Sequence, residues 1–322
     1  MKRSEILSRL LVIAGVLLVL SVPLAVHFYE GQGIVEIHGR MAESGGWSPN
    51  SIQAQVGVPL HLRLTSDDVM HGFAIGQSDM PAVDVAPGKM TEVALTFNKP
   101  GTYTYYCTRW CGPNHWRMRG TIEVSGGSSD APQPVSPPLY MTLNLNIDAP
   151  HPAIATPTER PSALRGAAFA AMLSSSYLTN DYYRAHSPSQ AYLDLRADPA
   201  LSSLSNPNVW DLVAYIWQSN TTPEGRAEGQ RLFARNCSAC HGESGGGDGV
   251  FSASVNAQTG KFPANFTDPA SLLGASPALL QGKILRGGMG TGMPYWGPIF
   301  ENETIWSIIG YIYTFQFDEV QK

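Results

Sequence analysis

The sequence predicts a multidomain chain with one N-terminal transmembrane helix, then an all-β sandwich, then an all-α region. Three observations predict this order: an uncharged opening stretch, short runs that alternate in polarity, and apolar residues at helical spacing near the C-terminus. The length of 322 residues suits two or three domains. The net charge of −5 argues against a general nucleic-acid binder, which would normally be basic, so we expect no nucleic-acid partner.

Residues 1–31 predict a membrane anchor. Lys2, Arg3 and Arg9 precede residues 10–26, which carry no charge. As a helix this stretch would reach about 25 Å, near the lower limit for a bilayer core. The alternative is a cleaved signal peptide, but the apolar run is long for one and no clear small-residue cleavage site follows it. The basic residues place the N-terminus in the cytoplasm, and the rest on the periplasmic or extracellular side of the cell membrane.

Residues 32–125 predict an antiparallel β-sandwich. Val93, Leu95 and Phe97 alternate with small or polar residues, which is the period of a half-buried strand. A Pro-Gly turn and a β-favouring run at 102–106 follow. Several short strands separated by such turns are typical of a sandwich.

A cluster of soft metal-binding side chains belongs to this region. It consists of His71, Cys107, Cys111, His115 and Met118. Two thiolates, two imidazoles and a thioether suit copper better than a hard cation. The alternatives are a structural zinc site of the two Cys and two His, and a Cys107–Cys111 disulfide. Neither uses Met118, and because a mononuclear blue-copper site needs one Cys, the second thiolate argues for a second copper.

The pattern His71…Cys107-x3-Cys111-x3-His115-x2-Met118 resembles the binuclear CuA domain of cytochrome c oxidase subunit II, a Greek-key cupredoxin sandwich. The resemblance implies that both cysteines bridge two coppers and that each histidine is a terminal ligand of one copper. It also implies two weak ligands, the thioether of Met118 and the main-chain carbonyl of Arg109.

Two departures from the family pattern matter. Many members carry, in place of Arg109, an acidic residue that helps bind magnesium at the interface with subunit I. Arginine stays cationic, so we expect no magnesium ligand from this side chain. The single predicted span resembles that of the B-type oxidases, in which a Glu before the helix lies at the mouth of a proton path. Glu5 occupies a comparable place, although an ordinary solvated residue is the alternative.

Residues 223–322 carry a signature of covalent haem attachment. Thr222 and Pro223 predict the start of a helix, and the run Cys237-Ser238-Ala239-Cys240-His241 follows it. In a C-x-x-C-H run the two thiols reach the vinyl groups of one porphyrin, and the adjacent His reaches the iron. Half of a zinc site and a thioredoxin-like pair are the alternatives. No second suitable Cys pair and no βαβ pattern accompany the run.

A His-ligated haem of this kind usually takes a Met on its other face, and Met289 and Met293 are the candidates. The segment resembles the Met loop of class I cytochromes c, where the ligand commonly precedes Pro, which favours Met293. We expect the last helix, at about 302–317, to pack Trp306 and Tyr311 near the haem edge and the first helix.

A Gly/Ser/Pro linker is predicted at 126–138. Residues 139–222 after it contain no Cys, but 209–217 weakly repeat 305–313: in both, Tyr and Ile follow Trp by five and six positions. Because the second copy closes the cytochrome-like region, 139–222 are interpreted as a degenerate cytochrome c-like domain without haem. Convergence on a common buried-helix pattern is the alternative.

One chain thus combines an anchor, a CuA-like site and a haem c site, with no open position for substrate and no expected catalytic residue. The predicted function is electron transfer, as subunit II of a haem-copper terminal oxidase. An external donor (a cytochrome c, a cupredoxin or a quinol-oxidising complex) would reduce haem c. CuA would pass the electron to catalytic subunit I in the membrane, where O2 is reduced to water.

Three alternatives compete with this predicted function. A CuA-containing nitric oxide reductase would use a similar subunit and differ in its catalytic subunit. A nitrous oxide reductase would need a large His-rich domain, whereas this chain has 8 His. A copper-delivery or assembly factor would not need a haem.

Overall fold

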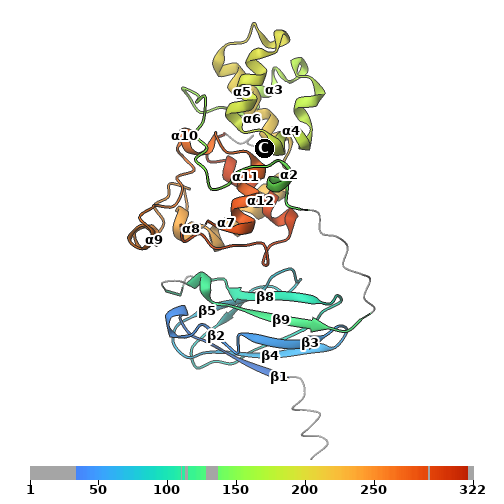
Figure 1. Cartoon of the computed structure of the whole chain (residues 1–322), viewed down its shortest axis with the longest axis vertical. Helices are drawn as coiled ribbons and strands as arrows, with labels where there is room; N and C mark the ends of the chain where they lie inside the picture. The colour runs from blue at the N-terminus through green and yellow to red at the C-terminus, as the bar shows by residue number, and fades with distance from the viewer. Residues whose placement is uncertain (1–33, 110, 113–114, 128–136, 289–290, 318–322) are drawn as a thin grey trace, which may run out of the picture.

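The computed structural model describes residues 34–109, 111–112, 115–127, 137–288 and 291–317. It contains a β-sandwich and a helical region stacked along the long axis of the molecule, with β8 of the sandwich nearest to the helices (Figure 1). The predicted anchor at 1–31 and Glu5 lie outside the described residues. Among the helices that the structure does describe, none has the length and apolar character needed to cross a bilayer.

The sandwich is built from two sheets. One contains, in spatial order, β2 (Trp47–Ser48), β1 (Ile34–Gly39), β4 (Pro59–Ser66) and β7 (Thr91–Thr96). The other contains β3 (Ser51–Gln55), β9 (Arg119–Ser125), β8 (Gly101–Cys107), β5 (His71–Ile75) and β6 (Val83–Val85). Apolar side chains from both sheets form one core that includes Ile37, Leu64, Phe73, Tyr105 and Ile122. The predicted β-sandwich is confirmed.

The sheets are not purely antiparallel, which corrects one expectation. The pairs β1–β4 and β3–β9 run parallel, while the other pairs are antiparallel. Alternation of polarity predicts that a segment is a strand with one buried face, but it carries no information on the direction of the neighbouring strand.

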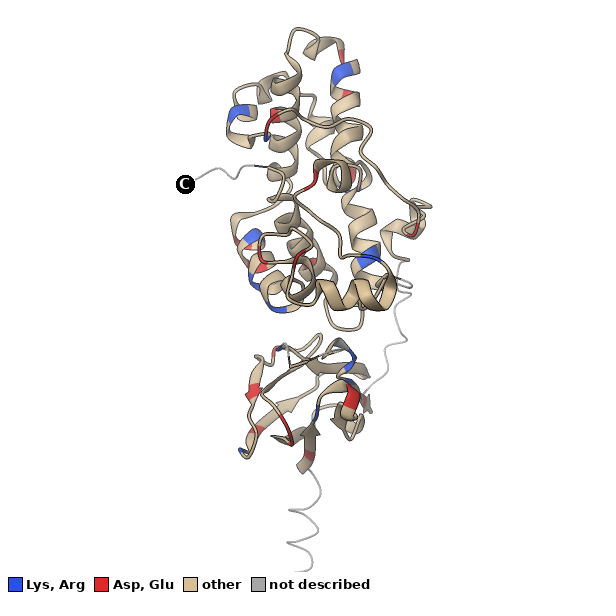
Figure 2. Cartoon of the chain, turned by 90° about the vertical axis from the view of Figure 1, so that its left-hand side faces the viewer, with Lys and Arg blue, Asp and Glu red and all other residues tan. Residues whose placement is uncertain are grey.

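The helical region begins with α2 (Leu139–Thr142), α3 (Ala163–Ala167), α4 (Asn180–Ala185), α5 (Pro188–Ala197) and α6 (Asn206–Ser219). It continues with α7 (Pro223–Asn236), α8 (Ser238–His241), α9 (Ser252–Thr259), α10 (Pro269–Leu272), α11 (Pro277–Arg286) and α12 (Asn302–Tyr313). The predicted start of α7 is confirmed, because the Thr222 hydroxyl accepts a hydrogen bond from the Gly225 amide and Pro223 is the first helical residue. Figure 2 shows basic and acidic residues interspersed on both the sandwich and the helical region.

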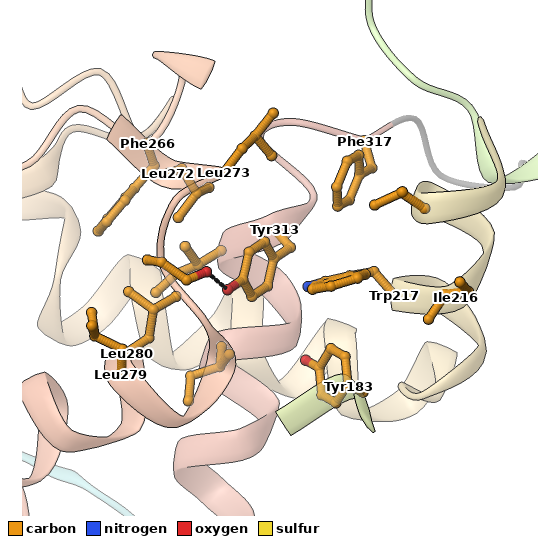
Figure 3. Packing of buried hydrophobic residues seen from close by; sticks show 14 of the residues in the cluster. Tyr183, Ile216, Trp217, Phe266, Leu272, Leu273, Leu279, Leu280, Tyr313 and Phe317 are labelled. Carbon is orange, nitrogen blue, oxygen red and sulfur yellow. Dashed lines mark hydrogen bonds between the residues drawn. The ribbon is translucent and has the colours of Figure 1, made fainter. Parts of the chain in front are cut away.

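One hydrophobic core runs through the helical region from Ile147 to Phe317. Figure 3 shows Trp217 of α6 facing Tyr313 of α12, with ring centroids 5.9 Å apart. The Tyr313 hydroxyl donates to the carbonyl of Ala275 at 2.7 Å, so this buried polar group is satisfied. The helices before and after residue 222 are therefore packed together.

The weak repeat corresponds to two similar helix crossings. A Cβ built on Gly166 of α3 would lie 2.0 Å from the Asp211 carbonyl oxygen in α6. A Cβ built on Gly229 of α7 would lie 2.0 Å from the Ser307 carbonyl oxygen in α12. Asp211 and Ser307 hold equivalent places in the two copies of the repeat. Each crossing thus needs a glycine so that the two helix backbones can touch.

Replacing Gly229 with alanine should destabilise the helical region, because the added methyl group would clash with the α12 backbone. We expect the free energy of unfolding to fall by about 2 kcal/mol. Gly225→Ala in the same helix is the matched control, since its Cβ would meet only side-chain oxygens at 3.1 and 3.7 Å. Urea unfolding followed by circular dichroism, at equal haem content, measures both. Equal effects of the two substitutions would contradict the close crossing.

Candidate metal centre and haem cavity

His71, Cys107 and Cys111 gather their ligand atoms within 4.8 Å of one another. Strand register explains how His71 and Cys107 come together. Phe73 of β5 lies opposite Cys107 at the end of β8, so His71 at the start of β5 reaches the same end of the sheet. The Sγ atoms of the two cysteines are 3.7 Å apart, and Nδ1 of His71 lies 4.0 Å from Sγ of Cys107. A disulfide would need about 2.05 Å, and all four cysteines are free thiols.

The remaining predicted ligands lie in the same place. Sδ of the fully buried Met118 lies 3.3 Å from Sγ of Cys111. The carbonyl oxygen of Arg109 lies 3.2 Å from Sγ of Cys107. His115 is buried in the short helix η2 (His115–Arg117) and interacts with the Cys107 thiol. The structure thus brings together all the residues that the sequence predicts at this site, and soft sulfur and imidazole donors around one buried point fit copper.

Electrostatics favours a thiolate at this site. The pKa of the Cys107 thiol lies far below its usual value, chiefly because of its hydrogen bond with Cys111, with smaller contributions from His115 and His71. Burial acts in the opposite direction. The same hydrogen bond raises the pKa of the Cys111 thiol, so the pair as a whole favours one thiolate, the form that binds a metal.

Asp68 orients His71, a role that the sequence did not reveal. The Nε2–H of His71 donates to Oδ1 of Asp68 at 2.8 Å, which turns Nδ1 toward the two thiols. The Asp68 carboxylate also accepts hydrogen bonds from the amides of Met41 and Val69 at 2.7 and 2.6 Å. A carboxylate behind a ligating imidazole fixes its tautomer and its orientation. No spacing rule marks such an aspartate, although it lies only three positions before His71.

The Arg109 side chain points away from the thiols. Its Nε and Nη2 donate to the two carboxylate oxygens of Asp84 at 2.6 and 2.8 Å, on the exposed surface near β6. The carbonyl of Arg109 and its guanidinium therefore have separate surroundings, one at the thiols and one at the surface.

A cavity of about 610 Å³ lies in the helical region, within the range of cofactor sites. Cys237, Cys240, His241 and Met293 all line it. The rest of the lining is mostly apolar and includes Phe266, Ile308 and Ile312. These residues fit a covalently held haem, because both thiols and the candidate axial side chains face one large apolar space.

His241 is held in place from behind. Its Nδ1–H donates to the carbonyl of Ala264 at 3.0 Å, and its ring stacks on Phe266 at 4.6 Å. Nε2 is then the nitrogen available for a metal, as in other ligating histidines whose second nitrogen bonds a carbonyl. Burial raises the pKa of the Cys237 thiol to about 12 and that of Cys240 to about 11.

The Met loop depends on one glycine. Gly287 has a φ of 74°, and a Cβ there would lie 2.6 Å from the Met293 carbonyl oxygen, so the loop can close tightly only with glycine. The Gly288 amide donates to that same carbonyl at 3.1 Å. Met289, the other candidate, lies outside the described residues.

One expectation about α12 is wrong. Tyr311 packs against Phe233 of α7, with ring centroids 5.4 Å apart, which confirms its expected contact with the first helix, but it does not line the cavity. Trp306 does not line the cavity either. Its indole ring lies under the guanidinium of Arg184, with the guanidinium carbon 4.4 Å from the ring centroid. The helix turns Ile308 and Ile312 to the cavity, whereas the half-buried Trp306 packs against the helical core.

A segment before α3 also lines the cavity. Residues 147–151 run along it, and Lys283 of α11 donates to the carbonyl of Ile147 at 2.7 Å. Arg286 forms an ion pair with Asp148. His151 belongs to the same lining.

Two family models match the regions of the chain in which the two candidate sites lie. Residues 48–125 match the model of the family described as cytochrome c oxidase subunit II, periplasmic domain. Residues 225–312 match that of cytochrome c oxidase, cbb3-type, subunit III. The chain joins a subunit II-like domain to a cytochrome c-like domain. These domains imply copper and haem c as cofactors.

Two relatives are cytochrome c oxidase subunits 2 of Thermus thermophilus. Each is 38% identical over 84 residues, which is 26% of this chain, and these residues cover 62% of one relative and 49% of the other. The chain thus spans between about half and three fifths of the length of these relatives.

Solved structures are also similar. A chain of a haem-copper terminal oxidase dimer is 25% identical, with 38% of this chain and 100% of that one covered and a TM-score of 0.26. The periplasmic domain of oxidase subunit II from Bradyrhizobium japonicum is 20% identical, with 29% and 84% covered and a TM-score of 0.26.

Removing the Asp68 carboxylate should weaken copper binding, because His71 loses the partner that orients it. We expect Asp68→Ala to lower copper affinity roughly 10- to 100-fold. The matched control is Asp67→Ala, since Asp67 pairs with His38 and Arg40 instead. Competition of the full chain with a copper chelator measures both, and equal affinities of the two variants would refute the role of Asp68.

Proposed function

We propose that this chain is the electron-transfer subunit II of a haem-copper terminal oxidase. Electrons from an external donor enter at the haem held by Cys237, Cys240, His241 and Met293. They pass to a binuclear copper site at Cys107 and Cys111, and then to a catalytic subunit in the membrane that reduces O2 to water. The two family matches support the two electron-carrying domains on one chain.

The observation that carries this proposal is the position of His115. This candidate copper ligand lines the same cavity as Met293 and His241. A carrier of single electrons needs its two centres close together, whereas a copper-delivery factor has no use for a haem cavity beside its copper ligands. The shared lining therefore favours a relay.

When bound, the copper pair and the haem each take up and release one electron at a time. The chain's own residues hold them and shield them. Cys107 and Cys111 supply thiolates, Asp68 fixes the His71 ring, and Met118 closes the site from the buried side. Around the haem cavity, the carbonyl of Ala264 fixes His241, and the Met loop brings Met293 into the lining of the same cavity. No residue is needed as a proton donor or nucleophile.

Placement at the membrane belongs to the same proposal. An anchor at 1–31, with its N-terminus in the cytoplasm, would hold both redox domains on the outer side, beside the catalytic subunit. Covalent haem attachment outside the cytoplasm agrees with this topology. The external donor would be a cytochrome c, a cupredoxin or a quinol-oxidising complex.

Residues 139–222 are proposed to be a degenerate cytochrome unit that acts as a spacer or docking module. The crossing of α3 on α6 resembles that of α7 on α12. The haem attachment run at 237–241 follows Gly229 of α7. At the same sequence separation after Gly166 of α3, residues 174–178 read Ser-Ser-Ser-Tyr-Leu, which is no haem attachment run.

Cys107→Ser should abolish the absorption of the copper pair and leave the haem spectrum intact, because the two sites share no cysteine. Visible absorption of the purified complex measures both centres at once. In the variant, oxygen consumption with a reduced donor should fall with the copper signal. Turnover of the unaltered complex on nitric oxide instead of oxygen would indicate a nitric oxide reductase. A copper signal that survives the substitution would refute the ligand assignment.

Met293→Ala should lower the haem midpoint potential and let the iron bind carbon monoxide or imidazole, since the thioether raises the potential and fills the sixth position. Redox titration and carbon monoxide difference spectra report the change. An unaltered haem would transfer the ligand role to Met289.

A further inference from the structure

Two side chains at the copper end of the sandwich face the helical region. Tyr106 of β8 and Arg119 of β9 are register partners. Each is the chain neighbour of a candidate copper ligand, Cys107 and Met118. Successive residues of a strand point to opposite faces of the sheet. Tyr106 and Arg119 therefore point toward the helical region, whereas Cys107 and Met118 point into the sandwich.

Arg119 makes a specific contact with the helical region. Its Nη1 donates to the carbonyl of Tyr295 at 2.6 Å. Its guanidinium carbon lies 4.7 Å from the Tyr295 ring centroid and 5.3 Å from that of Trp296. The cation is thus held by a charge-assisted hydrogen bond and by two aromatic faces, a combination that a planar guanidinium makes better than an ammonium.

Other contacts fit the same two surfaces together. Tyr106 packs against the helical core, and burial raises its pKa to about 12. Gly76 lies so close to the helical region that a Cβ there would be 2.7 Å from Cα of Ile299. Gln77 donates to the carbonyl of Gly297 at 3.4 Å. The surfaces are therefore complementary in shape around the arginine.

Tyr295 lies close in the sequence to a candidate haem ligand. Tyr295 follows Met293-Pro294, so it belongs to the loop that carries the candidate axial ligand of the haem. Arg119 follows Met118 at the copper site. The hydrogen bond from Arg119 to Tyr295 thus joins the copper-ligand strand directly to the haem-ligand loop.

We propose that Arg119 is a positioning residue that docks the haem loop on the copper end of the sandwich and so sets the rate of electron transfer within the chain. The inference rests on the proposed function and adds to it the residue that fixes the two centres. One electron leaves the haem iron, which is oxidised, and enters the copper pair, which is reduced; no bond forms and no proton moves. A tether such as the predicted linker supplies proximity but no orientation, and the arginine contact supplies the orientation.

The test compares Arg119→Gln with Arg117→Gln in the full chain within its membrane complex. Both remove one positive charge at the copper end, but Arg117 is exposed. The first readout is amide hydrogen exchange in 75–77 and 295–299, which reports docking without any electron flow. The second is the rate at which the copper pair is reduced after a flash that reduces the haem.

For Arg119→Gln we expect exchange in both segments to rise and electron transfer to slow by about tenfold, the effect of losing one charge-assisted hydrogen bond. Both absorption spectra should stay unchanged, and Arg117→Gln should match the unaltered chain. Tyr295→Ala removes one of the two aromatic rings that contact Arg119, and should reproduce part of the rise in exchange and of the fall in rate. If Arg119→Gln does not fold, Tyr295→Ala is the variant that tests the proposal.

The inference is overturned if exchange and rate in Arg119→Gln, or in Tyr295→Ala where the first variant does not fold, equal those of Arg117→Gln. Failure of the proposed function looks different: the unaltered chain would then lack the copper-pair or haem absorption, or its flash-reduced haem would pass no electron to copper.

Discussion

The pairing of β5 with β8 is the constraint on which the metal centre depends. With Phe73 opposite Cys107, the His71 ring is delivered to the thiols from a segment far away in the sequence. The turn after β8 then returns Cys111, His115 and Met118 to the same point before β9 begins. A shift of one residue in this register would turn the facing side chains to the opposite face of the sheet and separate the imidazole from the sulfurs.

The thiol cluster and the large cavity lie next to each other and share one residue. His115 takes part in the thiol cluster and in the lining of the large cavity. The residues next to the candidate copper ligands Cys107 and Met118 face the helices, while the candidate ligands themselves face the sandwich core. Strand alternation thus lets one hairpin hold a metal on one side and a second domain on the other.

Much of this arrangement could be predicted from the sequence, and the physical reason is locality. Cys107, Cys111, His115 and Met118 fall within one turn-sized segment, and Cys237, Cys240 and His241 within another, so spacing alone keeps them together. What the sequence did not reveal depends on contacts between distant segments. The carboxylate of Asp68 has a role only once the His71 ring is placed, and the run 147–151 lines the cavity only because α11 holds it there. Strand direction and the outward face of Trp306 likewise depend on neighbours that polarity patterns do not specify.

The most direct measurement of the central claim is the metal content of the purified full chain. Two thiols, two imidazoles and a thioether at one buried point, beside a cavity with a C-x-x-C-H run, predict two copper atoms and one haem iron per chain. Elemental analysis with a pyridine haemochrome assay should give this ratio. Zinc in place of copper, or a chain with its haem but without copper, would contradict the account.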